Sequence, residues 1–200
     1  STKSITGVTI KSGSTDVTSN YSITKNNGTL TVTAKAVTVT AGSTSKTYDG
    51  SALSYKNATL SGQVSGHTLN SYTCTGSITN VGSVNNVPSA AKIYSGSTDV
   101  TANYNITYKN GTLTVTQRSV TFTATNQSKV YDGSALSVAN TATATAGDGL
   151  VSGHTATFTC SATAVTNVGS STKSITGVTI KSGSTDVTAN YNITKKTGTL

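Results

Sequence analysis

The sequence has no tryptophan, no methionine and a single proline, and only 10% of its 200 residues are charged. All six acidic residues are aspartates, so glutamate is absent as well. These aspartates form no carboxylate pair, and the sequence has no nucleophile elbow and no glycine-rich phosphate loop. We therefore predict that the chain is not an enzyme and binds no cofactor.

Clustered positive charge, long apolar runs and metal-ligand motifs are missing too. The net charge is +8, but the lysines are scattered rather than gathered with aromatics into a basic stripe, so we expect no nucleic-acid partner. No apolar run is long enough to cross a bilayer, so we expect no membrane insertion in this segment. His67 and His154 fall one to a repeat, a spacing that does not build a metal site.

Cysteine is nearly absent, with only Cys74 and Cys160. They occupy matching positions of two repeats, so no disulfide can close within a repeat. Each follows an aromatic residue by two positions in an alternating pattern. We predict buried, free thiols that act as small core residues.

What is abundant is glycine, threonine, valine, asparagine and serine, a composition typical of short strands joined by tight turns. The sequence thus predicts an all-β fold. It also repeats itself: "KTYDGSAL" at 46–53 returns as "KVYDGSAL" at 129–136, and residues 1–30 return almost unchanged as 171–200. Such internal repeats indicate a tandem array of structural units.

The phase of the repeats divides the chain into three parts. Residues 1–34 are the C-terminal part of a preceding long-type repeat, 35–117 are a complete short-type repeat, and 118–200 are a long-type repeat lacking its closing strand end. The extra length of the long type falls in "NTATATAGDGL", Asn140 to Leu150. Each unit is large enough for a small β domain, either an Ig-like sandwich or a β-grasp-like fold.

The joints between units contain no flexible linker. "GTLTVTAKAVTVTA" and "GTLTVTQRSVTFTA" run from one unit into the next, and the apolar positions change parity across the joint, from Leu113 and Val115 to Val120. A nearly continuous strand with such a switch presents opposite faces to two cores. We expect a stiff, rod-like array.

Two recurring motifs carry the tyrosines. In Tyr48-Asp49-Gly50 and Tyr131-Asp132-Gly133 we expect the tyrosine to pack into the core and Asp-Gly to form a turn, with carbohydrate binding as the alternative. In "DVTxNY" we expect Tyr21, Tyr104 and Tyr191 to bond nearby backbone, as in a tyrosine corner, and Asp16, Asp99 and Asp186 to hold the loop; ligand stacking is the alternative. Asn110-Gly111 predicts a hairpin turn.

The order of the motifs "YDG", "VSGHT", "TNVGS", "GSTDVTANYNIT" and "GTLTVT" resembles the YDG-type and MBG-type repeats of large bacterial surface adhesins. The resemblance implies an extracellular module on the bacterial cell surface, without enzymatic activity, that serves as a structural part of a stalk or filament. Its partners would be neighbouring repeats of the same chain. Lateral self-association and contact with glycans or a host surface are further options.

Two more expectations follow from the resemblance. An adhesin module would bind glycan or a host protein through loops such as Asn140–Leu150, which is the alternative function. Bacterial surface stalks also contain Lys–Asn isopeptide bonds, for which Lys46 and Lys129 are the candidate lysines. Their candidate asparagines are Asn80, Asn167, Asn103 and Asn190.

Overall fold

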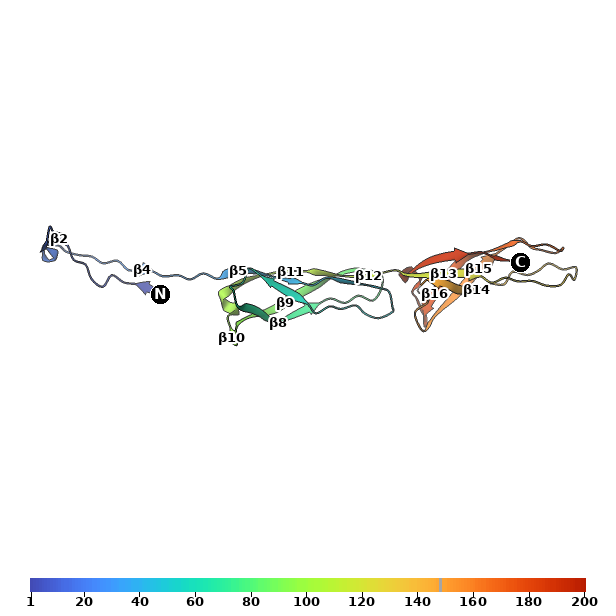
Figure 1. Cartoon of the computed structure of the whole chain (residues 1–200), viewed down its shortest axis with the longest axis horizontal. Helices are drawn as coiled ribbons and strands as arrows, with labels where there is room; N and C mark the ends of the chain where they lie inside the picture. The colour runs from blue at the N-terminus through green and yellow to red at the C-terminus, as the bar shows by residue number, and fades with distance from the viewer. Residues whose placement is uncertain (148) are drawn as a thin grey trace.

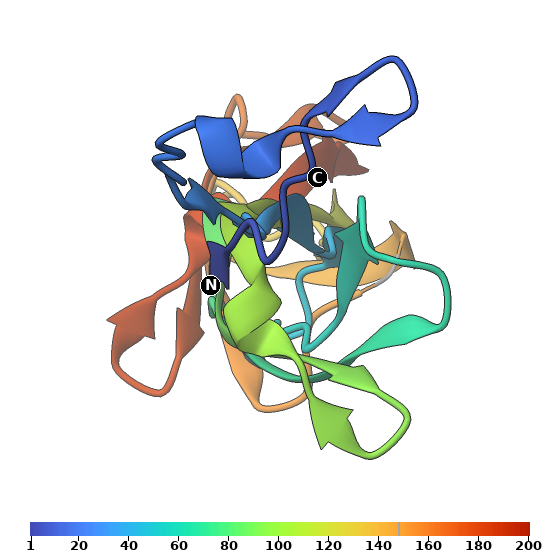
Figure 2. The same cartoon turned by 90° about the vertical axis from the view of Figure 1, so that its left-hand side faces the viewer.

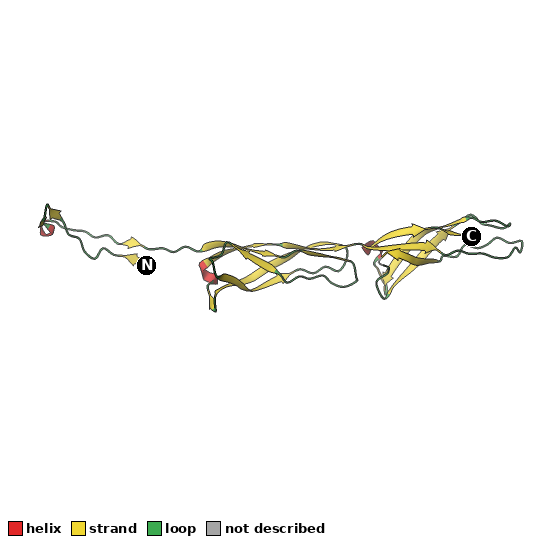
Figure 3. Cartoon of the chain, in the orientation of Figure 1, coloured by secondary structure: helices red, strands yellow, loops and turns green. Residues whose placement is uncertain are grey.

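The computed structural model describes residues 1–147 and 149–200, and this part of the chain is all-β (Figure 3). Its helical segments are single 3-10 turns: η1 (Thr18–Asn20), η2 (Thr101–Asn103) and η3 (Thr188–Asn190). Across these residues, no helix has the length and hydropathy needed to cross a membrane. The extended backbone agrees with the many β-branched residues of the sequence.

Residues 1–34 form two small antiparallel pairs. Strand β1 (Thr2–Lys3) pairs with β4 (Gly28–Thr29), and β2 (Lys11–Ser12) pairs with β3 (Thr15–Asp16). All four strands are exposed along their length. This segment therefore buries almost none of its own apolar surface.

Residues 35–117 divide their strands between two sheets. One sheet has the order β11-β5-β7, and the other has the order β10-β9-β12-β6 with β8 added beside β9. The strands are β5 (Lys35–Ala41), β6 (Thr44–Thr47), β7 (Ala58–Ser61), β8 (His67–Thr75), β9 (Gly82–Ser95), β10 (Thr98–Asp99), β11 (Tyr104–Lys109) and β12 (Gly111–Thr116).

Residues 118–200 repeat this pattern. Their sheets are β14-β13-β18 and β15-β16-β17, with β19 beside β16. The strands are β13 (Arg118–Ala124), β14 (Ala142–Gly147), β15 (His154–Ser161), β16 (Thr172–Ser182), β17 (Thr185–Asp186), β18 (Tyr191–Lys196) and β19 (Gly198–Thr199). Figure 1 shows β5–β12 gathered together and β13–β16 gathered beyond them. In the described residues each strand pairs only within its own range.

Equivalent hairpins mark each range of strands. They are β2–β3, β9–β10 and β16–β17, each turning at a Gly-Ser pair. Figure 2 shows these hairpins in blue, light green and orange-red, projecting in different directions around the long axis of the molecule.

The joint between β12 and β13 is a single residue, Gln117. Val115 and Val120 on either side are each 1% exposed and belong to one buried cluster. The buried positions are odd in β12 and even in β13. The parity change predicted from the sequence is therefore confirmed, and it lets one run of chain contribute to both sides of a common core.

The predicted hairpin at Asn110-Gly111 is wrong. Strand β11 pairs in parallel with β5, whereas β12 pairs in parallel with β6 and antiparallel with β9, so the two strands enter different sheets. The glycine is needed for close approach rather than for a turn. A Cβ atom at Gly111 would overlap the carbonyl oxygens of Ala41 and Gly42.

The prediction that Asn140–Leu150 forms a loop is also wrong for most of its length. Residues 142–147 are strand β14, which pairs antiparallel with β13 and shifts register between Thr121 and Phe122. Alternating small residues fit a pleated strand as readily as a loop. Asp148, within the same segment, lies outside the described residues.

Both cysteines are free, as predicted, but neither is fully buried. They lie on β8 and β15, each of which pairs with one strand only in the described sheets, and both side chains are half-buried. Desolvation raises the pKa of the Cys74 thiol, which lies 3.5 Å from the Asn57 carbonyl oxygen. The prediction of full burial is therefore wrong, although Cys160 packs against the buried cluster as expected of a small core residue.

Candidate functional site

The Tyr48-Asp49-Gly50 loop is held in place by its own side chains. The Asp49 carboxylate accepts hydrogen bonds from the Ser51 amide at 2.9 Å and the Ser51 hydroxyl at 2.8 Å, and Lys46 Nζ lies 2.6 Å away. The Lys46 ammonium, followed by the Ser51 bonds, holds the pKa of Asp49 far below its ordinary value. The predicted turn is present, since Gly50 has a φ of +80°.

The second copy of the loop has the same bonds. Asp132 lies 2.7 Å from Lys129 Nζ and accepts from the Ser134 amide and hydroxyl. Both candidate isopeptide lysines are thus paired with an aspartate of their own loop, not with an asparagine. No bond from either lysine to a candidate asparagine is seen in the described residues, so the assignment of Lys46 and Lys129 to that role gains no support and stays a prediction.

Tyr48 is buried against the next range of strands rather than inside its own sheets. Its side chain is 2% exposed and meets Tyr191 edge-on, with ring centroids 5.6 Å apart, and His154 at 6.0 Å. A Cβ atom at Gly50 would lie 3.3 Å from a methyl group of Val151. Tyr48 therefore packs into a core, as predicted, but that core contains residues from both sides of the joint.

Tyr191 connects the Tyr48 ring to the loop before β15. Its hydroxyl accepts a hydrogen bond from the Val151 amide at 3.1 Å and bonds His154 Nδ1 at 2.7 Å. Burial raises the pKa of Tyr191. The hydroxyl does bond a backbone group, but the prediction that this group is close in sequence is wrong, because Val151 lies 40 residues away in the chain.

The "DVTxNY" motif works differently in its three copies. Tyr104 makes the same bonds as Tyr191, to the Val64 amide and to His67 Nδ1, whereas Tyr21 is 57% exposed. The aspartates hold their loops as predicted, each accepting from the threonine two residues later: Asp16 from Thr18, Asp99 from Thr101 and Asp186 from Thr188. The exposed Tyr21 is a correction to the predicted tyrosine corner.

Sequence reasoning missed these threonines. Each hydroxyl accepts a hydrogen bond from the amide of the isoleucine eight residues earlier: Thr18 from Ile10, Thr101 from Ile93 and Thr188 from Ile180. The signal was the unchanged Thr in every "DVT". In a chain with so many threonines, that signal has little weight.

Two asparagines close the joint on its polar side. The Asn190 side-chain oxygen accepts from the Val81 amide at 2.8 Å, and its Nδ2 donates to Asn80 Oδ1 at 3.0 Å. Asn190 is only 5% exposed, so these hydrogen bonds satisfy a side-chain amide that is almost completely shielded from water. Gln117 adds a bond from its Nε2 to the Ala189 carbonyl at 3.1 Å.

We call this assembly the junction. Its donor side, named for the tyrosine that it inserts, consists of the Tyr48 loop with Asn80 and Val81. Its acceptor side, which receives that tyrosine, consists of Val151, His154, Asn190 and Tyr191. Leu53 and Ile78 on the donor side pack against the same buried cluster as Phe122 and Ile180. The junction is therefore a continuation of the core, tied by oriented amides.

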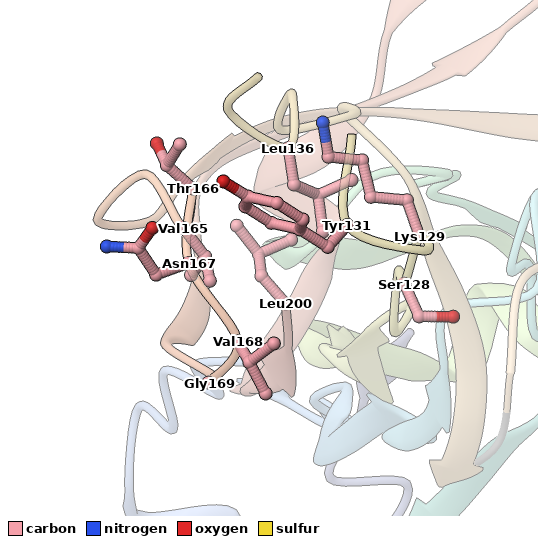
Figure 4. Close-up of a pocket in the computed structure, with 10 residues that line it drawn as sticks. All are labelled: Ser128, Lys129, Tyr131, Leu136, Val165, Thr166, Asn167, Val168, Gly169 and Leu200. Atoms are coloured by element: carbon pink, nitrogen blue, oxygen red, sulfur yellow. The ribbon is translucent and has the colours of Figure 1, made fainter. Parts of the chain in front are cut away.

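The chain carries a second, unfilled copy of each side. Tyr131 is 62% exposed and Val168 is 95% exposed, and they line a hollow with Leu136, Val165 and Leu200 (Figure 4). The second acceptor side is another hollow, lined by Val32, Val64, His67, Asn103 and Tyr104. These are the positions that repeat the junction residues in sequence.

A buried lysine also escaped the sequence analysis. Lys173 is 0% exposed, and its Nζ donates to the Thr125 carbonyl, Gln127 Oε1 and Thr141 Oγ1 at 3.0 to 3.2 Å. The matching position of the preceding repeat is Asn86, also 0% exposed, whose Nδ2 donates to the carbonyls of Gly42 and Tyr55. Both residues tie the segment that follows the first strand of the unit, β5 or β13, to a central strand, β9 or β16.

Comparisons with protein-family models, with curated proteins and with solved structures find no match to this chain. The resemblance to surface-adhesin repeats thus stays a prediction from the sequence, and function has to be argued from the junction itself.

Proposed function

We propose that the chain is a structural repeat segment of an extracellular bacterial stalk or filament. In this proposal it is a tandem array of small β domains whose joints are stiff, so that it holds a tip or links cells at a distance. The division of each unit's strands between two sheets favours a sandwich over a β-grasp-like fold.

The observation that carries the proposal is the burial of Tyr48 against Tyr191 and His154 at a joint of one residue. A flexible linker leaves neighbouring domains free to reorient, whereas a one-residue joint with a shared core and satisfied amides resists reorientation. A stalk needs resistance to bending, whereas an enzyme or a free binding module does not.

The adhesin alternative gains no support from the segment on which it rested. Residues 142–147 of Asn140–Leu150 are bonded along β13 as an edge strand, so they do not project from the sheet as a free loop. No other observation favours glycan or host-protein binding over the structural role.

The two native cysteines provide the test, because Cys74 and Cys160 lie on opposite sides of the junction. Spin labels on them should give a narrow distance distribution. Tyr48→Ala removes the side chain that fills the joint, so we expect the distribution to broaden by about twofold or more. Tyr131→Ala, the same substitution in the unfilled copy of the motif, is the matched control and should leave it unchanged.

A broad distribution in the unsubstituted chain would refute the stiff array. The extracellular setting has its own measurement: antibodies raised against the chain should label intact cells of the source bacterium before permeabilisation. Labelling only after permeabilisation would contradict the surface assignment.

A further inference from the structure

We propose that the array has two kinds of joint, a reinforced one from a short-type to a long-type unit and a more compliant one from a long-type to a short-type unit. The reinforcement comes from Gln117, Arg118 and the extra residues of the long type. The proposal rests on the proposed function and makes the short–long pair, not the single unit, the rigid element of the array. It also gives a role to the length difference between the two types.

The contacts that fill the junction are common to both kinds of joint. At the short-to-long joint, Tyr48 packs against His154 and Tyr191, and Asn80 bonds Asn190. The same residue types recur in sequence at the positions that form the long-to-short joint, which are Tyr131, His67, Tyr104, Asn167 and Asn103. We therefore expect both joints to bury a tyrosine, and any difference between them must come from other residues.

The first such difference is the linking residue itself. Gln117 Nε2 donates to the Ala189 carbonyl at 3.1 Å and lies 3.4 Å from the Tyr191 carbonyl, so it ties the joint to the turn that carries Asn190. The residue at the matching position of the other joint is Ala34. Alanine has no side-chain donor, so this tie exists only where a short-type unit precedes a long-type one.

The second difference is the residue that follows. Arg118 Nε donates to the Gly149 carbonyl at 2.8 Å, which ties the first strand of the long-type unit to the segment leading to Val151 of the acceptor side. The matching residue of the short-type unit is Lys35. A lysine ammonium is a flexible point charge, whereas the planar guanidinium of arginine holds a carbonyl in a fixed direction.

The third difference is the extra length of the long type. Gly147 lies opposite Val120, and three residues, Gly149 among them, separate it from Val151. In the short type, Gly62 lies against Val37, which repeats Val120, and one residue separates it from Val64, which repeats Val151. The carbonyl that Arg118 holds thus belongs to a stretch that the short type lacks.

These three features act on the same joint. Each hydrogen bond is weak by itself, but the bonds of Gln117 and Arg118 flank the buried tyrosine cluster, so tilting one unit against the other strains them together. A long-to-short joint keeps the tyrosine cluster without these bonds. Bending of the array is then concentrated at every second joint, and the units move as short–long pairs.

The first test exchanges the joint residues in the present chain. Gln117→Ala with Arg118→Lys gives the short-to-long joint the residues of the other joint. We expect the distance distribution between spin labels on Cys74 and Cys160 to broaden by about 1.5-fold or more. The reverse exchange, Ala34→Gln with Lys35→Arg, lies outside the span between the two cysteines and is the matched control, which should leave the distribution unchanged.

The second test compares the two joints directly. The full chain followed by a second copy of residues 31–200 stays in phase, because residues 171–200 repeat residues 1–30. Labels on Cys74 and Cys160 of the first copy span a short-to-long joint. Labels on Cys160 of the first copy and Cys74 of the second span a long-to-short joint, with the other two cysteines replaced by serine in each case. We expect the second distribution to be broader by about twofold.

The outcomes separate this proposal from the proposed function. Equal, narrow distributions at both joints, or no response to Gln117→Ala with Arg118→Lys, would overturn the two kinds of joint and leave the stiff array intact. Broad distributions at both joints of the unsubstituted chain would overturn the stiff array as well. A narrow short-to-long joint beside a broader long-to-short joint is the expected result.

Discussion

Lys173 and Asn86 show how one position can serve two repeats with different chemistry. Each is fully buried and donates to carbonyl groups that precede the body of its unit, those of Thr125 and Gly42 respectively. The lysine reaches three oxygens, whereas the asparagine reaches two and leaves its own Oδ1 without a partner. A buried polar group is stabilising only while its bonds are made.

This difference gives a prediction for Lys173→Met. The variant keeps the aliphatic volume but removes all three hydrogen bonds of the buried ammonium group, so we expect unfolding to cost about 1–3 kcal/mol less free energy. Lys173→Asn copies the preceding repeat and should lose less, because its amide can donate to Thr125 as Asn86 does to Gly42. Denaturant unfolding of both variants measures this, and a greater loss for Asn than for Met would contradict it.

Gly111 supports a second prediction at this scale. A methyl group there would overlap the Ala41 and Gly42 carbonyl oxygens, which belong to the backbone and cannot rotate away. We expect Gly111→Ala to destabilise the chain by about 2–4 kcal/mol in denaturant unfolding. Gly7→Ala, at a position with nothing within 4 Å, is the control and should change little. Equal effects would show that crowding is not the cause.

At the scale of elements, the turns are held by aspartates whose pKa values are all lowered. In Asp49 and Asp132 a lysine is the main cause, and in Asp16, Asp99 and Asp186 it is a threonine. A carboxylate with a lowered folded pKa contributes stability that is present above its unfolded value, about 3.9, and is lost as the pH falls toward the folded value.

We therefore expect the melting temperature to be constant with respect to these groups from neutral pH down to about pH 5, and to fall below about pH 4. The measurement is thermal unfolding followed by circular dichroism. Asp49→Asn should flatten part of the acid decline, since the variant has no carboxylate to protonate there. A decline equal to that of the unsubstituted chain would show that the Tyr48 loop does not contribute.

The junction has an opposite dependence on pH, since burial raises the pKa of Tyr191. A raised pKa means that the folded state keeps its proton longer, so this stability is complete below the unfolded value, about 10, and is lost as the pH rises through the folded one. The spin-label distances between Cys74 and Cys160 should therefore broaden above about pH 10. Tyr191→Phe keeps the ring without the ionisable group and should remove that response.

The strands were predictable to different degrees for physical reasons. The joint at Gln117 follows from period-2 alternation, because burial on a strand is decided by parity alone. The Asn110-Gly111 hairpin failed because the same dipeptide serves a tight turn or a close approach, and only tertiary structure decides between them. The prediction of a loop at β14 failed because small alternating residues do not distinguish a strand from a loop.

At the scale of the whole molecule, the site depends on neighbours that local sequence does not contain. Tyr48 and Tyr131 stand in almost identical octapeptides, yet one is 2% and the other 62% exposed. Tyr48 packs against Tyr191 and His154 of the next range of strands, and no ring contact of this kind is seen at Tyr131 among the described residues. The loop chemistry around Asp49 could be read from sequence, since its partners are within five residues, whereas the pairing of Asn80 with Asn190 joins positions 110 residues apart.

The proposed stiffness of the joint gives a prediction for the molecule as a whole. Inserting Gly-Gly after Gln117 separates the two sides of the junction and adds freely rotating residues. The maximum dimension measured by small-angle scattering should therefore become shorter, and the distribution of interatomic distances broader. The same insertion after Gly13, at the tip of the exposed β2–β3 turn, is the control and should leave the profile nearly unchanged. Identical profiles for the two insertions would contradict the shared core.

The parallel pairing of β5 with β11, and of β6 with β12, decides how the chain carries a pulling force. The polypeptide enters this range at β5 and leaves it at β12, so tension drags the paired strands in opposite directions along their length. Every bond from Tyr104–Lys35 to Lys109–Thr40 is then loaded in shear and must rupture together, instead of unzipping one after another. In a single-molecule pulling experiment we expect such a clamp to yield only at high force and all at once, which is the response that the proposed stalk requires.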